Sequence, residues 1–166
     1  MKTFMTAFLI SFAVLAVGCS TCKQSAKESA PRSPFSIELS TGGGFSGMYS
    51  GFIIKSDGSV LYWSGMYGKR EQVRPLGSLD VSEVVKLKAL IDGQKLSAFA
   101  HRETGNMTTA LAVTDGEMLY TITWPGMDSD TDPVPETVKP VHAELLRLLS
   151  PFREKAASLP HDQNKK

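Results

Sequence analysis

The sequence predicts an α+β fold, a mainly antiparallel sheet of about five strands with two α-helices packed on one face. Short segments in which apolar and polar residues alternate have the period of a half-buried strand, and Asp-Gly separates two pairs of them. Two longer segments repeat apolar residues at helical spacing. Strands joined by tight turns pair antiparallel, and each amphipathic helix needs an apolar surface to cover. Both needs are met when the helices share one face of the sheet.

Three strands are predicted in the first part of the domain. Residues 35–40 alternate apolar and polar side chains, and a glycine-rich turn follows at residues 41–47. The apolar and aromatic segments 49–55 and 59–64 are separated by Asp57-Gly58, which predicts a hairpin. Because a half-buried sheet places only alternate residues in the core, some aromatic side chains of this hairpin should reach the other face.

A weaker strand is expected around residues 71–74, and a capped helix follows it. Asp80 is the predicted N-cap, and Glu83 stands three residues later, as in a capping box. Gly93 is expected to end this helix. Its apolar face is formed by Val81, Val84, Leu87 and Ile91.

A second hairpin and a second helix complete the domain. Residues 107–113 and 118–124 alternate in polarity on either side of Asp115-Gly116, which predicts two paired strands. After a loop at residues 125–135, helical spacing resumes, with Pro140 in the first turn, where proline is tolerated. The apolar positions of this helix are Val141, Leu145, Leu148 and Phe152.

The N-terminal segment predicts export. Lys2 precedes an apolar run at residues 4–17 that is too short to cross a bilayer as a helix and is typical of a signal peptide. The run ends in Ala16-Val17-Gly18-Cys19, which resembles the lipobox of bacterial lipoproteins. That resemblance implies cleavage before Cys19, lipid attached to its thiol and, with Ser20 next, sorting to the outer membrane. Ordinary signal peptidase would cut the same bond and leave Cys19 unmodified.

Removal of the signal leaves a mature chain of balanced charge. Residues 1–18 contain one lysine and no acid, so Lys+Arg falls from 18 to 17 against 17 Asp+Glu. Nucleic acids select a clustered basic excess, and we therefore expect no nucleic-acid partner. The polar composition predicts a disordered tether at residues 19–34, one domain at residues 35–152 and a flexible tail at residues 153–166.

The glycine-rich turn is the candidate binding element. Gly42-Gly43-Gly44-Phe45-Ser46-Gly47 satisfies the spacing G-x-G-x-x-G, but a dinucleotide site also requires a helix next, and a strand is predicted there. Phe45 should be exposed between the glycines. Aromatic and methionine side chains around the first hairpin are common in protein-binding surfaces, although they also fill ordinary cores. This group comprises Tyr49, Tyr62, Trp63, Met66 and Tyr67.

No motif for a metal, a cofactor or an activated nucleophile is complete. Asp128, Asp130 and Asp132 resemble the start of a calcium loop, but Pro133 and Lys139 stand where glycine and glutamate are required, which leaves a weak cation site or a solvated loop. The three histidines, His101, His142 and His161, are far apart and belong to no ligand motif. His142 follows the apolar Val141 on the last helix and is expected to be partly exposed.

The pattern as a whole is similar to the emfourins, small inhibitors of thermolysin-type metalloproteases. The similarity spans about residues 35–149. It rests on the stretch from Ser40 to Gly47, the helix opened by Leu79-Asp80, and Pro135 before the leucine-rich helix at residues 145–149. The lipobox and an insertion at residues 64–78 depart from the family. Uncharacterised bacterial lipoprotein domains of similar hairpin and helix pattern are an equally close comparison.

The sequence therefore predicts a lipid-anchored, non-enzymatic protein of the cell envelope that binds another protein, with protease inhibition as the sharper hypothesis. Two alternatives stay open. One is an envelope hydrolase whose site is assembled from distant residues. The other is a structural lipoprotein without a tight ligand.

Overall fold

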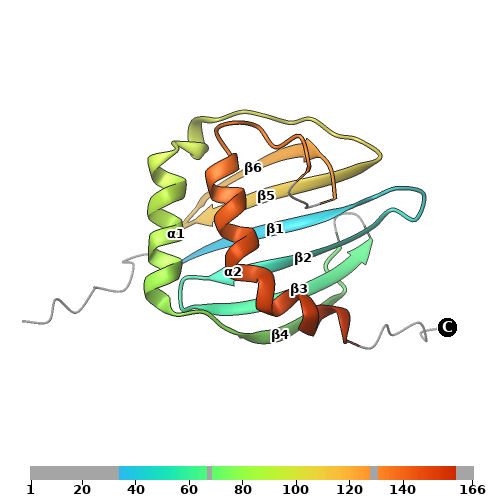
Figure 1. Ribbon diagram of the computed structural model, residues 1–166, viewed down its shortest axis with the longest axis horizontal. Coiled ribbons are helices and arrows are strands. Elements are labelled where there is room, and N and C mark those ends of the chain that lie inside the picture. Colours follow the sequence, from blue (N-terminus) through green and yellow to red (C-terminus); the bar gives the residue numbers. More distant parts are fainter. Residues whose placement is uncertain (1–33, 67–68, 128–130, 160–166) are drawn as a thin grey trace, which may run out of the picture.

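The computed structural model describes residues 34–66, 69–127 and 131–159. An antiparallel six-stranded sheet in the order β4-β3-β2-β1-β5-β6 carries both α-helices on one face (Figure 1). The strands are β1 (Phe35–Gly43), β2 (Met48–Lys55), β3 (Ser59–Met66), β4 (Gln72–Ser78), β5 (Met107–Asp115) and β6 (Met118–Pro125). The helices are α1 (Val81–Gly93) and α2 (Lys139–Ala157), and a short 3-10 helix spans Leu96–Ala98. The predicted α+β class is confirmed.

The sixth strand is β4, which the sequence marked only as a weak strand around residues 71–74. β4 pairs with β3 at the edge of the sheet, and the register shifts between Val60 and Leu61. Pro75 and Gly77 lie within it. Both residues weaken a strand pattern in sequence, yet proline is tolerated at a sheet edge, where one side of the strand needs no donor. The sheet therefore has one strand more than the sequence clearly indicated.

Both Asp-Gly hairpins form as predicted. Gly58 and Gly116 adopt positive φ values of 89° and 59° in the two turns, and Asp57 Oδ1 accepts a hydrogen bond of 2.9 Å from Ser59 N. β1 lies between β2 and β5 at the centre of the sheet. The chain reaches β5 from the first hairpin only by way of α1, which carries it across the apolar face.

α1 begins at the predicted cap. The side chain of Asp80 accepts a hydrogen bond of 2.7 Å from Ser82 N. The helix ends at Gly93, but the left-handed residue is Lys95, with φ 54°. Lys88 ties the helix to the second hairpin, because its ammonium group lies 2.8 Å from carboxylate oxygens of both Asp92 and Asp115.

α2 continues past Phe152 to Ala157, into the segment predicted as a tail. Pro140 lies in its first turn, as expected. His142 is buried, at 5% exposure, and lies edge-on to the Trp124 ring with 5.5 Å between ring centroids. The expectation of partial exposure was wrong because His142 shares a helical stripe with Leu145 and Leu149, at positions i, i+3 and i+7.

The core lies between the sheet and the two helices. Ile37, Leu39, Leu111 and Ile122 face the helices from the strands and are at most 2% exposed. Val84, Leu87, Leu145 and Leu149 meet them and are at most 1% exposed. In the described ranges, neither helix combines the length and apolar character needed to cross a bilayer. Because both helices lie on one side, the opposite sheet face, called the open face below, carries no helix (Figure 1).

Candidate functional site

The glycine-rich turn forms the tip of the β1–β2 hairpin. β1 extends to Gly43 and β2 begins at Met48, so only residues 44–47 form the turn itself. Gly44 and Gly47 adopt left-handed φ values of 62° and 61°, which glycine accepts without the steric cost of a Cβ atom. Phe45 projects from this turn with 111% relative exposure. The predicted exposure of Phe45 is confirmed, and nothing in the described structure holds its ring.

A row of methionines continues the apolar surface behind Phe45. Met107 pairs with Gly43, Gly43 with Met48, and Met48 with Met66, so one rung crosses β5, β1, β2 and β3. Met48 and Met66 are 45% and 48% exposed. The tip of the hairpin extends past both helices in Figure 1. Phe45, Met48, Met66 and Met107 are called the hairpin end below. A flexible, polarizable apolar surface of this kind is suited to contact with another protein.

The open face carries a second feature, a pocket of about 600 Å³. Its floor follows from the register, which aligns Trp63, Gly51, Ser40, Ala110 and Thr123 in one rung across five strands. The three central residues of this rung are small, while bulkier side chains stand at its ends, so the sheet is hollowed in the middle. The lining residues are Glu38, Ser40, Tyr49, Trp63, Lys69, Arg70, Thr104, Thr108, Ala110, Thr121 and Thr123.

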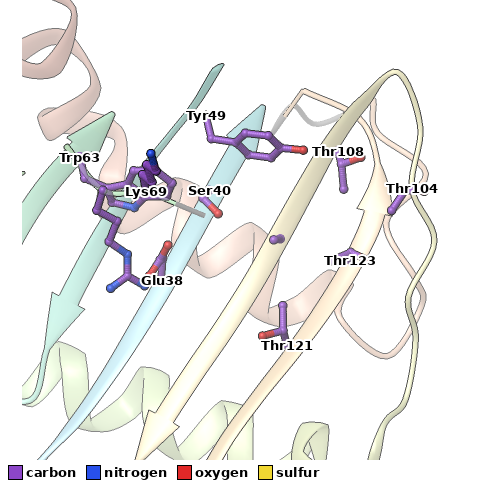
Figure 2. Close-up of a pocket in the computed structure, with 11 residues that line it drawn as sticks. Glu38, Ser40, Tyr49, Trp63, Lys69, Thr104, Thr108, Thr121 and Thr123 are labelled. Carbon is purple, nitrogen blue, oxygen red and sulfur yellow. Dashed lines mark hydrogen bonds and ion pairs between the residues drawn. The ribbon is translucent and has the colours of Figure 1, made fainter. Parts of the chain in front are cut away.

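The walls of the pocket differ in chemistry. Trp63 and the Glu38–Arg70 ion pair stand on one side, and the threonines of β5 and β6 stand on the other (Figure 2). The Arg70 guanidinium lies over the Trp63 ring, 5.8 Å from its centroid. The Tyr49 ring extends over Gly42, where a Cβ atom would come within 2.4 Å of Tyr49 Cγ. Glycine at this position therefore lets the tyrosine lie flat at one end of the pocket.

Glu38 is the buried charge of the pocket, with 12% of its side chain exposed. Burial raises the pKa of Glu38 above its ordinary value, and the Arg70 charge acts in the opposite direction. The Trp63 indole N–H also favours the charged carboxylate, although no acceptor in the described structure comes within hydrogen-bonding geometry of Trp63 Nε1. Trp63 itself is only 5% exposed, and its Nε1 atom is fully covered.

The histidines do not converge on either feature. His101 stacks on Phe99 with 5.7 Å between ring centroids, and His142 lies in the core against Trp124. Neither residue lines the pocket, and His161 lies outside the described residues. The site of a histidine-dependent hydrolase was expected to bring one of them together with serine and acidic side chains, and this arrangement does not occur in the described residues.

The remaining predicted sites lie largely outside the described residues. Cys19, the signal peptide, most of the tether and Tyr67 belong to this group, as do Asp128 and Asp130 of the candidate cation loop. Asp132 is described and lies against Gly126. Within the described ranges, no three His, Cys, Asp or Glu side chains gather as metal ligands would.

The sequence contained the residues of the pocket but no motif for it. Glu38, Ser40 and Ala110 occupy ordinary polar or small positions on the predicted strands, and only the register brings them into one rung. The alternation of small and polar residues on the open face was the available signal. Comparison of the chain with protein-family models and with curated proteins gives no match.

Proposed function

We propose that this protein is a lipid-anchored, non-enzymatic protein of the bacterial cell envelope that binds another protein through its hairpin end. The lipobox at residues 16–19 supports export and lipid attachment at Cys19, with the outer membrane, on its periplasmic side, as the proposed location. Two or three acyl chains would hold a domain of this size on a membrane durably, since each buried methylene contributes about 0.8 kcal/mol.

The observation that carries the binding proposal is the complete exposure of Phe45 on a glycine-rich turn. An exposed phenylalanine costs free energy in water and gains it when buried in a partner's pocket. A narrow hairpin tip can enter a cleft that a flat surface cannot. The methionines behind Phe45 can adapt to the rim of such a cleft.

The sharper form of the proposal is inhibition of a thermolysin-type metalloprotease, which the resemblance of residues 35–149 suggests. Residual protease activity would be measured at increasing ratios of the protein to the enzyme. We expect activity to fall to a plateau near equimolar ratio. Proteolysis that is unchanged at a large excess of the protein would overturn this form of the proposal.

The anchor has a separate test. Intact-mass measurement of membrane-extracted protein should give a chain that begins at Cys19 and carries the added mass of acyl chains. A chain with an unmodified Cys19, or one that retains residues 1–18, would contradict lipid attachment.

The positions of the histidines count against the hydrolase alternative. His142 is committed to the core and His101 to a stack on Phe99, and neither reaches the pocket that holds Glu38. The proposal of a binding protein therefore uses features that the structure places at the surface.

A further inference from the structure

The open-face pocket is built for a ligand smaller than a protein. Its volume of about 600 Å³ lies in the range of small-molecule sites. The floor is formed by Ser40 and Ala110, next to Gly51 in the same rung, and larger side chains at these two lining positions would fill the hollow. Paired strands form the floor of the hollow, and the loop residues Lys69, Arg70 and Thr104 complete its lining.

The polar groups of the pocket match a ligand rich in hydroxyl groups. Ser40 and four threonines line the pocket, and a hydroxyl donates and accepts hydrogen bonds without carrying charge. The Thr108 hydroxyl is bonded to the Gly105 backbone, which leaves the hydroxyls of Ser40 and the other three threonines for a ligand. Figure 2 shows Ser40 at the floor and the threonines grouped on the β5–β6 side. The lining threonines are Thr104, Thr108, Thr121 and Thr123.

Trp63 stands opposite the threonines. Its Nε1 atom has no acceptor in hydrogen-bonding geometry in the described structure and is fully covered, so a ligand in the pocket does not reach it. The Glu38 carboxylate, whose charged form this indole favours, is the acceptor that a ligand meets on this side.

The charges in the pocket are largely compensated. Glu38 and Arg70 form an ion pair, so a ligand meets one carboxylate acceptor and one guanidinium donor. Lys69 adds one positive charge to the lining. The Tyr49 ring is only half-buried, and an aromatic face attracts the C–H groups on the flat side of a sugar ring.

We propose that the open-face pocket binds a short saccharide of one or two rings. The Tyr49 ring forms a stacking surface at one end, and the threonines and Glu38 exchange hydrogen bonds with sugar hydroxyls. This site is separate from the hairpin end, and it can hold a ligand whether or not Phe45 binds a protein.

The test uses the indole N–H signals of the two tryptophans in NMR spectra of the full chain. The chain is extracted in a detergent without a sugar headgroup and titrated with chitobiose, with cellobiose, with glucuronic acid and with a tetrapeptide. We expect at least one saccharide to shift the Trp63 signal, because Trp63 and the Glu38 carboxylate beside it both line the pocket. The Trp124 signal should stay in place, since that residue is fully buried on the helix side.

Variants of the lining define the site. Thr123→Val should raise the dissociation constant of the responding saccharide about tenfold, because one hydrogen bond to the ligand is lost. Ala110→Leu should abolish the shift by filling the floor. Thr114→Val is the matched control, because this exposed threonine also lies on β5 but does not line the pocket.

The proposal is overturned if no saccharide moves the Trp63 signal at 50 mM, a concentration at which even ligands with dissociation constants of about 10 mM bind. It is equally overturned if only the tetrapeptide moves it, or if Thr123→Val and Thr114→Val change the affinity alike. Unfolding of Ala110→Leu leaves the Thr123 comparison decisive. Phe45→Ala should bind the saccharide as the unmodified chain does, which separates this result from the fate of the hairpin proposal.

Discussion

At the scale of single residues, the hairpin end and the pocket each hold one side chain in surroundings opposite to those that its chemistry prefers. Phe45 is apolar and entirely exposed, whereas Glu38 is charged and mostly buried. Each residue is unfavourable in its place when the protein is alone, because water solvates apolar surface poorly and a protein interior solvates charge poorly. Residues of this kind are often kept for a function.

Glu38 gives the molecule a defined response to pH. Because burial raises its pKa, Glu38 holds a proton in the folded state over a pH range in which the unfolded chain has already lost it. Its contribution to stability is therefore present in full below the unfolded pKa and is lost as pH rises through the folded pKa. Glutamine cannot titrate, so this dependence should be absent in Glu38→Gln.

Urea unfolding of the two proteins at a series of pH values from 4 to 7 measures this effect. The stability of the unmodified chain should fall relative to that of Glu38→Gln as pH rises. Taking the difference cancels the carboxylates whose pKa values are lowered, such as Asp57 and Glu144. A constant difference across the range would show that Glu38 titrates alike in both states.

At the scale of elements, the start of α1 depends on one side chain. Asp80 caps the helix, and the hydrogen bonds from the Ser82 side chain and backbone hold its pKa below the ordinary value. The stability it contributes is present above the unfolded pKa and is lost as pH falls through the folded pKa.

Asp80→Ala should lower the thermal midpoint at neutral pH, whereas Asp80→Asn should retain most of it, since asparagine caps about as well as aspartate. Calorimetric melts at pH 7 compare the three proteins. Equal losses in both variants would mean that charge, and not the capping hydrogen bond, is what α1 requires.

The sequence predicted well those elements that begin or turn at a short local motif. Local backbone geometry is determined by the side chain of a capping aspartate or by the missing Cβ atom of a turn glycine. The motifs of this kind are Asp57-Gly58, Asp115-Gly116 and the Asp80 cap. β4 was only weakly indicated because it contains a proline and a glycine. It forms nonetheless, because it pairs with β3. His142 was misplaced because its burial depends on the combined stripe of α2, which no single neighbour reveals.

At the scale of the whole molecule, the core lies on one face of the sheet, and the two proposed binding features lie on the remainder. α2 buries its apolar side chains against the sheet, and Leu149 is fully buried there. The open face and the hairpin end contribute little to this core. Substitutions in the two regions should therefore separate folding from function.

Leu149→Ala should cost about 2–5 kcal/mol in the free energy of unfolding, through lost burial and the cavity that remains. Leu119→Ala, at a site that is 67% exposed, should change it by no more than about 0.5 kcal/mol. Urea unfolding at neutral pH compares the pair. Similar losses at the two sites would contradict the placement of the core beneath α2.

The pocket could not be predicted from the sequence as a site, because its floor exists only through register. Aromatic side chains of the first hairpin were expected on this face, and Tyr49 and Trp63 do line the pocket. Ser40, Gly51 and Ala110 lie on three strands, and a shift of one residue in either pairing would turn one of them to the other face. The hairpin loop, by contrast, was found from sequence because its glycines and Phe45 are contiguous. The fold class was predictable since periodicity and turn signals are also local.

The measurement that most directly tests the central claim compares Phe45→Ala with Met118→Ala as inhibitors of a thermolysin-type metalloprotease. Met118 is 56% exposed at the turn between β5 and β6, at the opposite end of the sheet from the hairpin end. We expect Phe45→Ala to raise the inhibition constant at least about tenfold, the effect of removing a central aromatic contact. Met118→Ala should match the unmodified chain. Equal inhibition constants for all three proteins would contradict the claim that the hairpin end binds the partner.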